Sequence, residues 1–275
     1  MSSLRELKSG SLNELVESIK QRIRKAPQNA DLRAQLFQLL AIQGQWSKAA
    51  DQLKLSGEMN EQAQPSVVLY INAIEAENER MEVLAGNKMP AVFAEPPAWM
   101  ALLLQALQES GQQANHLREQ ALEMANAVAG EIETLDESVQ PFEWLTDGDG
   151  RLGPVCEFIS NNRYGWVPFE QIDEINLIKP DGLTDLIWAQ AELRLLDGRS
   201  HMGLIPVRYP EVSETYQADE ALSLARKTEW ESLSETMYIG HGQKVLIGDN
   251  QEAALLDIRR LRFFPAPKEQ AHAVS

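Results

Sequence analysis

The sequence predicts an α+β protein of two domains, in which an all-α region of tetratricopeptide-like helical repeats precedes a mainly β domain. We place the first domain at residues 1–138 and the second, a small barrel or bent sheet with one or two helices, at residues 141–275. Three observations lead to this prediction. A chain of 275 residues is long enough for two hydrophobic cores, a repeat is visible near the start, and beyond Pro141 the apolar runs become short and are bounded by turn residues.

The repeat consists of two segments, GSLNELVESI at 10–19 and GQWSKAADQL at 44–53, whose spacing of 34 residues is the tetratricopeptide period. Their alignment pairs Gly10 with Gly44. Gly44 can end one helix, and the small side chain of Ala49 lets two helices approach closely. Two unrelated amphipathic helices would give the same pattern, and this alternative stays open.

The remainder of the first half reads as three more helices. One long helix covers residues 66–85 and ends at Gly86, and the proline-containing stretch 89–99 must be an extended link. Two helices joined near Gly111 follow. Four acidic residues of the long helix are most simply a solvated face, with docking of a basic partner as the alternative: Glu75, Glu77, Glu79 and Glu82.

Short strands are expected throughout the second half. One hairpin turns at Asn161 and Asn162, and a second turns at Asp197 and Gly198. A single helical stretch, ADEALSLARKTEWESLSE at 218–235, interrupts the strands. Strand pairs at this spacing are typical of a strongly bent sheet or a small barrel. The expected strands are 154–160, 164–169, 174–180, 187–196, 201–207, 244–249 and 255–264.

Charge and hydropathy exclude several classes of function. The formal net charge is −16 and both halves of the chain are acidic, so neither nucleic acid nor an anionic membrane is expected as a partner. No apolar run approaches the roughly 18 residues of a membrane-spanning helix. The polar amino terminus indicates no secretory signal, and therefore a cytoplasmic protein. The single cysteine, Cys156, agrees with a reducing compartment and is expected to be a small core residue.

The stretch DGDGRLGPVCEF at 147–158 resembles the start of a calcium-binding loop, with Asp147 and Asp149 spaced like metal ligands. Such a loop needs glycine at its sixth position and a bidentate acid at its twelfth, which here are Leu152 and Phe158. Arg151 adds a cation inside the loop and would hold an aspartate in an ion pair. We therefore expect a structural turn in which the aspartates accept backbone hydrogen bonds and two glycines, Gly150 and Gly153, adopt unusual dihedral angles.

No catalytic residue, metal site or cofactor is predicted. The four histidines lack the spacing of a metal site, and neither a nucleophile elbow nor a phosphate-binding loop occurs. Most of the six tryptophans are expected in the core, although one or two can line a peptide-binding surface, where tryptophan and arginine are enriched. The candidate partner-binding residues are Trp166, Trp188, Arg208 and Tyr209.

A family pattern runs through the second half of the chain. In order, it comprises WLTDGDGRLGPVCEF, YGWVPF, DLIWAQAEL, LIPVRYP, LARKTEW, GHGQKVL and LLDIRRLRFF. Together with PPAW at 96–99 and the repeat-like front end, this succession resembles the ImpE/TagJ/SciE family, the accessory proteins of bacterial type VI secretion systems. The family elements fall on the expected structural residues Asp147, Asp149, Arg151, Gly153, Pro154, Arg226 and Trp230.

The resemblance implies a cytoplasmic, non-enzymatic adaptor that binds the small contractile-sheath subunit, TssB, through its amino-terminal helical segment. Such a protein would modulate sheath assembly or the recycling of contracted sheath by ClpV. Not every branch of the family need share the sheath contact. A scaffold for another assembly is one alternative. A second is a small-ligand-binding protein or hydrolase that brings together Asp149, Glu157, Arg226, Glu229 and His241.

Overall fold

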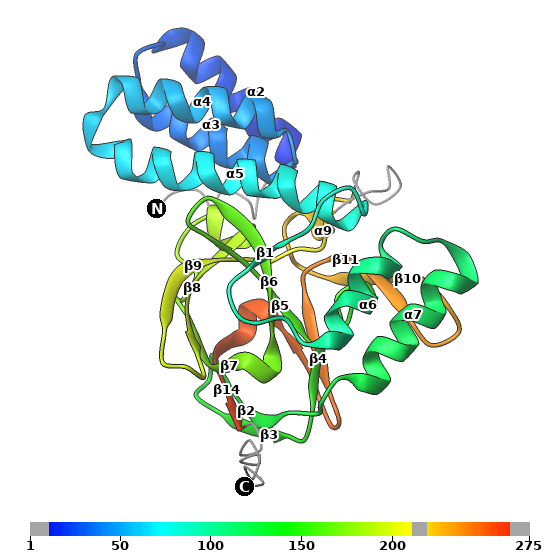
Figure 1. The fold of residues 1–275 in the computed structure, drawn as a ribbon. Helices are drawn as coiled ribbons and strands as arrows, with labels where there is room; N and C mark the ends of the chain where they lie inside the picture. Colours follow the sequence, from blue (N-terminus) through cyan, green and yellow to red (C-terminus); the bar gives the residue numbers. More distant parts are fainter. Residues whose placement is uncertain (1–10, 211–218, 265–275) are drawn as a thin grey trace, which may run out of the picture.

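The computed structural model describes residues 11–210 and 219–264. Among the described residues, four helices come first and lie together above the sheet in Figure 1. Their ends follow from local sequence: the Ser11 side chain and Glu14 form a capping box at the start of α2, Asn29 caps α3, and Gly44, with φ of 68°, follows the end of α3. These helices are α2 (Leu12–Lys25), α3 (Ala30–Ile42), α4 (Trp46–Met59) and α5 (Gln64–Leu84).

The two segments of the predicted repeat begin α2 and α4, and their apolar positions are buried. Ile19 and Leu53 are 5% and 4% exposed, and Ala49 is fully buried. The predicted long helix corresponds to α5. The tetratricopeptide-like character of these helices stays a prediction.

An extended link with one short strand leads from α5 to a helical pair. The strand β1 (Ala91–Val92) pairs in parallel with β6 (Arg163–Pro168). The helices α6 (Ala98–Ala106) and α7 (Gly111–Met124) lie beside the sheet in Figure 1. The predicted link and the two helices meeting near Gly111 are therefore present. Trp99 of α6 donates a hydrogen bond from Nε1 to Glu170, which ties this pair to the sheet at 3.1 Å.

Nine strands form one sheet in the order β1-β6-β5-β9-β8-β7-β14-β2-β3. A three-stranded sheet (β13-β12-β4) and a two-stranded sheet (β10-β11) complete the β structure of the described residues. The remaining strands of the large sheet are β2 (Ala129–Thr134), β3 (Val139–Phe142), β5 (Val155–Ser160), β6 (Arg163–Pro168), β7 (Ile172–Leu177), β8 (Trp188–Leu195), β9 (Ser200–Pro206) and β14 (Ile258–Phe264). The small sheets use β4 (Leu145–Asp147), β10 (Thr228–Ser232), β11 (Tyr238–Gly242), β12 (Val245–Gly248) and β13 (Glu252–Ala254).

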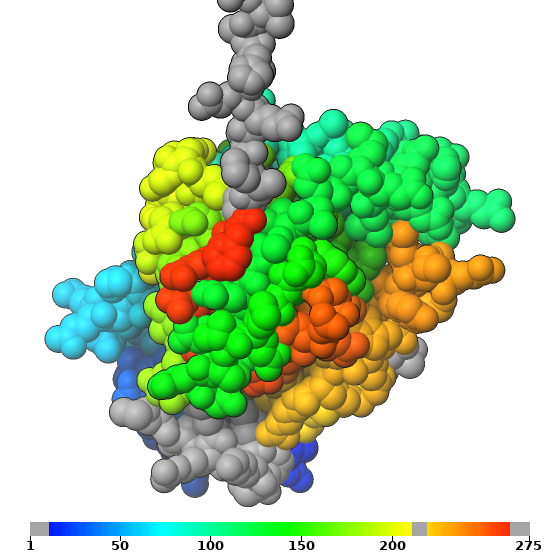
Figure 2. Space-filling model, turned by 90° about the horizontal axis from the view of Figure 1, so that it is seen from below, coloured from blue at the N-terminus to red at the C-terminus, as the bar shows by residue number. Residues whose placement is uncertain are grey.

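Two expectations about secondary structure are wrong. The helical stretch predicted at 218–235 contains only a short helix, α9 (Glu220–Ser223), and continues as the strand β10. The first half is not all helical, because β2 lies within 1–138 and pairs with β14 from the far end of the chain. Figure 2, seen from below, shows the red residues of β14 against green residues of this earlier part of the chain.

Two hydrophobic clusters make up the core. One lies within the sheet region and includes Phe158, Ile172 and Phe263. The other runs from the first four helices into the sheet, so that residues such as Leu36 and Val83 belong to the same cluster as Trp188. The helices and the sheet are therefore joined by a shared apolar core. None of the described helices is long and apolar enough to span a lipid bilayer.

Candidate functional site

A buried cluster of charged side chains lies where α5 meets the sheet, and Glu157 is at its centre. All six residues of β5 are buried, and the Glu157 side chain has no exposed surface. Arg80 of α5 grips this carboxylate in a two-pronged contact, with Nε 2.7 Å from Oε1 and Nη2 2.8 Å from Oε2. The Tyr164 hydroxyl donates to Oε1 at 2.5 Å, and Lys244 Nζ lies 2.7 Å from Oε2. The contacts with Arg80 are the strong, bidentate kind.

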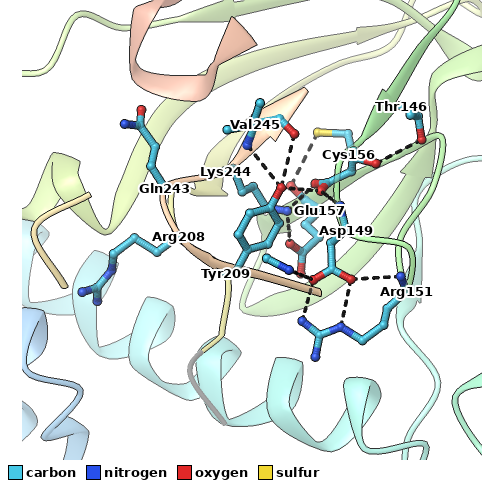
Figure 3. A network of polar contacts seen from close by, with 12 residues as sticks. Thr146, Asp149, Arg151, Cys156, Glu157, Arg208, Tyr209, Gln243, Lys244 and Val245 are labelled. Atoms are coloured by element: carbon cyan, nitrogen blue, oxygen red, sulfur yellow. Dashed lines mark hydrogen bonds and ion pairs between the residues drawn. The ribbon is translucent and has the colours of Figure 1, made fainter. Parts of the chain in front are cut away.

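Lys244 connects this centre to Asp147 at the end of β4. Its Nζ lies 2.5 Å from Asp147 Oδ2, and the Tyr209 hydroxyl donates to Asp147 Oδ1 at 2.9 Å. The ammonium also lies 4.7 Å from the centroid of the Tyr209 ring, within the range of a cation–π interaction. Figure 3 shows Lys244 and Tyr209 beside the carboxylates, whereas the Arg208 side chain lies apart from them.

The turn after β4 supplies a second buried ion pair. Asp149 is fully buried and lies 2.6 Å from Arg151 Nη2. Its carboxylate also accepts hydrogen bonds from the backbone N–H of Arg151 at 2.9 Å and of Gly240 at 3.1 Å. The Asp147 carboxylate accepts from the Asp149 N–H at 2.9 Å, and Gly153 has φ of 66°. These contacts hold the turn, β11 and β4 in one arrangement.

Arg80 of α5 also contacts two groups other than Glu157. Its Nη1 lies 3.3 Å from Glu77, which also accepts a 2.9 Å hydrogen bond from Trp188 Nε1. Arg80 Nη2 donates to the backbone carbonyl of Arg208 at 3.0 Å. Arg80 thus contacts β5 and the segment after β9, while Glu77 on the same helix accepts a hydrogen bond from Trp188 at the start of β8. These contacts orient α5 on the sheet.

The pKa values follow from burial and from these contacts. Burial alone would raise the pKa of Glu157, but Arg80 and Lys244 outweigh it and hold this pKa well below its usual range. Burial raises the pKa of Asp147, and Lys244 opposes the change only in part. Burial would lower the pKa of Lys244, whereas the two carboxylates raise it above its usual value. Ion pairing therefore dominates at Glu157 and at Lys244.

Beside the cluster lies a cleft of about 310 Å³ between the first helices and the sheet. We call it the junction cleft. Its apolar walls come from the end of α3, the start of α4, α5 and α9, and its polar walls include Glu77, Arg80 and Arg208. Arg208 Nη1 donates to the carbonyl oxygens of Ile42, at 2.9 Å, and Ser223. The apolar and aromatic lining residues are Ile42, Trp46, Met81, Ile187, Tyr209, Pro210 and Leu222.

The residues predicted to contact a partner lie mostly inside the protein. Trp188 is fully buried, and Trp166 and Tyr209 are 1% and 3% exposed. Trp166 donates its Nε1–H to the Tyr164 hydroxyl at 2.7 Å. Burial corrects the expectation that Trp166 and Trp188 form a partner-binding surface, because both pack in the core. Tyr209 is also buried and contributes only to the lining of the junction cleft. Arg208 alone of the four is partly exposed, and it lines the junction cleft.

None of the five residues of the enzymatic alternative lines the junction cleft. Asp149 and Glu157 are buried and engaged with separate arginines. Glu229 contacts Lys227, and buried His241 lies 3.3 Å from Glu231. Arg226, the remaining residue of this alternative, is exposed beyond α9. Two residues of the family motifs lie elsewhere: Pro154 directly precedes β5, and the ring centroid of Trp230 lies 5.7 Å from that of Tyr209. Within residues 11–210 and 219–264, no group of three or more His, Cys, Asp or Glu side chains is placed to hold a metal ion.

Sequence reasoning missed Arg80, Lys244 and Glu77, which carry much of the cluster. Glu77 belongs to the row of acids interpreted as a solvated face, yet it is only 5% exposed. Arg80 occurs in none of the quoted motifs, and Lys244 lies within GHGQKVL, where the pattern assigned it no role. For α5 the available signal was the apolar spacing: Ala73, Ala76 and Val83 share the buried side of the helix with Glu77 and Arg80.

The thiol of Cys156 should resist chemical modification in the folded protein. Burial raises the pKa of Cys156 to about 12, so that almost no thiolate forms at pH 8. We expect alkylation by iodoacetamide at pH 8 to be far slower in buffer than in denaturant, as measured by mass spectrometry over time. Equal rates in the two conditions would contradict the burial of this side chain.

Known proteins share the fold of this chain and the sequence pattern of its second half. The structure defines an α+β protein in which a set of helices is fixed onto a large sheet by buried ion pairs. The crystal structure of protein VPA1032 from Vibrio parahaemolyticus shares this fold, with a TM-score of 0.82, 22% identity, and coverage of 98% of this chain and 99% of that one. Residues 139–262 match the model of the ImpE protein family.

A curated relative makes the assignment specific. The type VI secretion system accessory component TagJ of Pseudomonas aeruginosa is 42% identical over 263 residues, which cover 94% of this chain and 90% of the relative. This chain therefore belongs to the ImpE/TagJ family. The family resemblance predicted from the motifs is confirmed.

Proposed function

We propose that this protein is a non-enzymatic, cytoplasmic adaptor of a type VI secretion system that binds the amino-terminal helix of the small contractile-sheath subunit, a TssB-like protein. Through that contact it modulates sheath assembly or the ClpV-dependent recycling of sheath. The observation that carries the proposal is the 42% identity to TagJ, an accessory component of such a system, over 94% of this chain.

The candidate site supports an adaptor better than an enzyme. Asp149 and Glu157, the two carboxylates of the enzymatic alternative, are fully engaged in buried ion pairs. A general base needs a carboxylate that reaches a substrate proton, which these two side chains do not offer. The first helices and the sheet instead enclose the junction cleft, which suits the binding of a segment from a partner protein.

Binding of the sheath helix should be of moderate strength. A single amphipathic helix buries a modest apolar face and loses chain entropy when it becomes ordered. We therefore expect a Kd in the micromolar to high-nanomolar range, on the order of −8 to −9 kcal/mol. Because the chain has a net charge of −16, lysine or arginine on the peptide would add a salt-dependent attraction.

Titration of the full chain into a labelled peptide that covers the first helix of the cognate small sheath subunit tests the proposal by fluorescence anisotropy. A peptide of the same composition with two prolines in its centre is the control, because it cannot form the helix. Saturable binding of the first peptide alone is the expected result. Absence of binding at about 100 μM would leave the proposed role without its contact.

A further inference from the structure

The junction cleft has the size of a side chain rather than of a helix. Its volume of about 310 Å³ is at the lower end of the range for ligand pockets. A helix with its side chains is about 10–12 Å across and does not fit into such a space. A helix lying over the cleft could, however, place one large side chain inside it.

The polar groups in the walls already have partners within the protein. Glu77 accepts hydrogen bonds from Trp188 and Arg80, and Arg80 is further bound to Glu157 and to a backbone carbonyl. Arg208 donates to two carbonyl oxygens. Gln43 also lines the cleft and donates a hydrogen bond to Asn13. The apolar part of the lining includes Trp46 at the start of α4, Met81 on α5 and Leu222 on α9.

These walls are held rigidly. Trp46 packs against Trp188, with 5.7 Å between ring centroids, and the Arg80–Glu157 contact fixes α5 on the sheet. A cavity whose walls are fixed before binding requires little reordering when it is filled. Such contacts favour a cleft whose walls are in place before a partner binds.

We infer that the junction cleft receives one large apolar side chain, such as leucine, methionine or phenylalanine, from the partner helix. This inference rests on the proposed function and adds the position and chemistry of the anchoring contact. A free small ligand would need polar groups to orient it, and the polar wall groups are engaged inside the protein. The net charge of −16 favours a partner whose anchor is flanked by lysine or arginine.

A substitution that fills the cleft tests the inference. Met81 is half-buried and lines the cleft, so tryptophan at this position should occupy the space that the anchor needs. Leu69→Trp is the matched control, because Leu69 lies on the same helix, is 39% exposed and does not line the cleft. Met81→Trp should weaken binding of the sheath-helix peptide about tenfold or more, whereas Leu69→Trp should leave Kd unchanged. Thermal unfolding of both variants checks that they are folded.

Methyl NMR locates the contact in the unchanged protein. With ¹³C-methyl methionine, addition of the peptide should shift the Met81 resonance, assigned with the variant Met81→Leu. It should leave that of Met202, which is 63% exposed on β9, in place. If the peptide binds the wild type but Met81→Trp binds equally well and the Met81 resonance stays fixed, the inference is overturned and the proposed function stands. If the peptide does not bind the wild type, both are overturned.

Discussion

Replacing Arg80 with leucine is expected to lower the free energy of unfolding by about 3–5 kcal/mol, because it leaves buried carboxylates without their main partner. Glu157 has no exposed side-chain surface and receives two short hydrogen bonds from Arg80. Glu77 loses its 3.3 Å contact as well. Lys244 cannot compensate fully, since it also pairs with Asp147. Urea unfolding followed by circular dichroism measures the change.

A matched surface arginine provides the control. Arg194 pairs with Asp173, but its side chain is 43% exposed, so that Arg194→Leu should change the unfolding midpoint little. The double variant Arg80→Leu/Glu157→Leu should be more stable than Arg80→Leu alone, because it removes an uncompensated charge. A loss from Arg80→Leu no larger than the loss from Arg194→Leu would show that the buried cluster does not hold α5 on the sheet.

Gly240→Ala should be the second strongly destabilising change. A Cβ atom at this position would lie 2.2 Å from the Tyr209 ring, far closer than atoms approach. The ring would have to move, which breaks the 2.9 Å hydrogen bond between its hydroxyl and Asp147. Overpacking of this kind costs about 1–3 kcal/mol, and the lost buried hydrogen bond adds about 1 kcal/mol or more. Thermal unfolding by calorimetry measures the sum.

Gly182→Ala is the control for this substitution. An added Cβ there would meet its nearest neighbours, atoms of Asp185 and Thr184, at 3.8 Å, which is ordinary contact. We expect a neutral or slightly stabilising effect, because alanine restricts the unfolded chain. Similar melting temperatures for the two variants would mean that the Tyr209 ring yields without cost, against the close packing described above.

The hairpin at Asn161 and Asn162 shows what local sequence determines. Both residues adopt left-handed backbone angles, with φ of 50° and 62°, which asparagine tolerates better than most residues. The flanking strands β5 and β6 form where the apolar runs predict them. A two-residue turn between apolar runs can therefore be predicted from the local sequence alone.

The strand β10 shows what local sequence does not determine. Its residues follow directly on a helix-forming stretch, so that a single helix is the simplest reading of the sequence. In the structure Ala225 has φ of 51°, which ends the helix, and Trp230 lies opposite Gly240 of β11. Gly240 leaves room for the Tyr209 ring, which a larger residue would displace. The strand β10 therefore forms through its pairing with β11, which the local sequence does not identify as its partner.

In the buried cluster, too, the local sequence predicts some contacts and not others. The ion pair between Asp149 and Arg151 could be predicted because the two residues are two positions apart in the chain. Arg80 could not, because its carboxylate partner Glu157 lies 77 positions away in the chain. Charged residues on a helix usually face water. Arg80 is buried here because both the other helices and the sheet cover α5.

The position of β14 within the sheet has a consequence for the order of folding during synthesis. This strand is made last among the described elements, yet it lies between β2 and β7 instead of at an edge. When the ribosome has released the first helices, these can already pack against one another through local contacts. β2 and β3 must wait until more than a hundred further residues have emerged before β14 joins them to the sheet. Until then β2 lacks its neighbour on one side, and an unpaired strand edge of this kind makes an incomplete chain prone to aggregation.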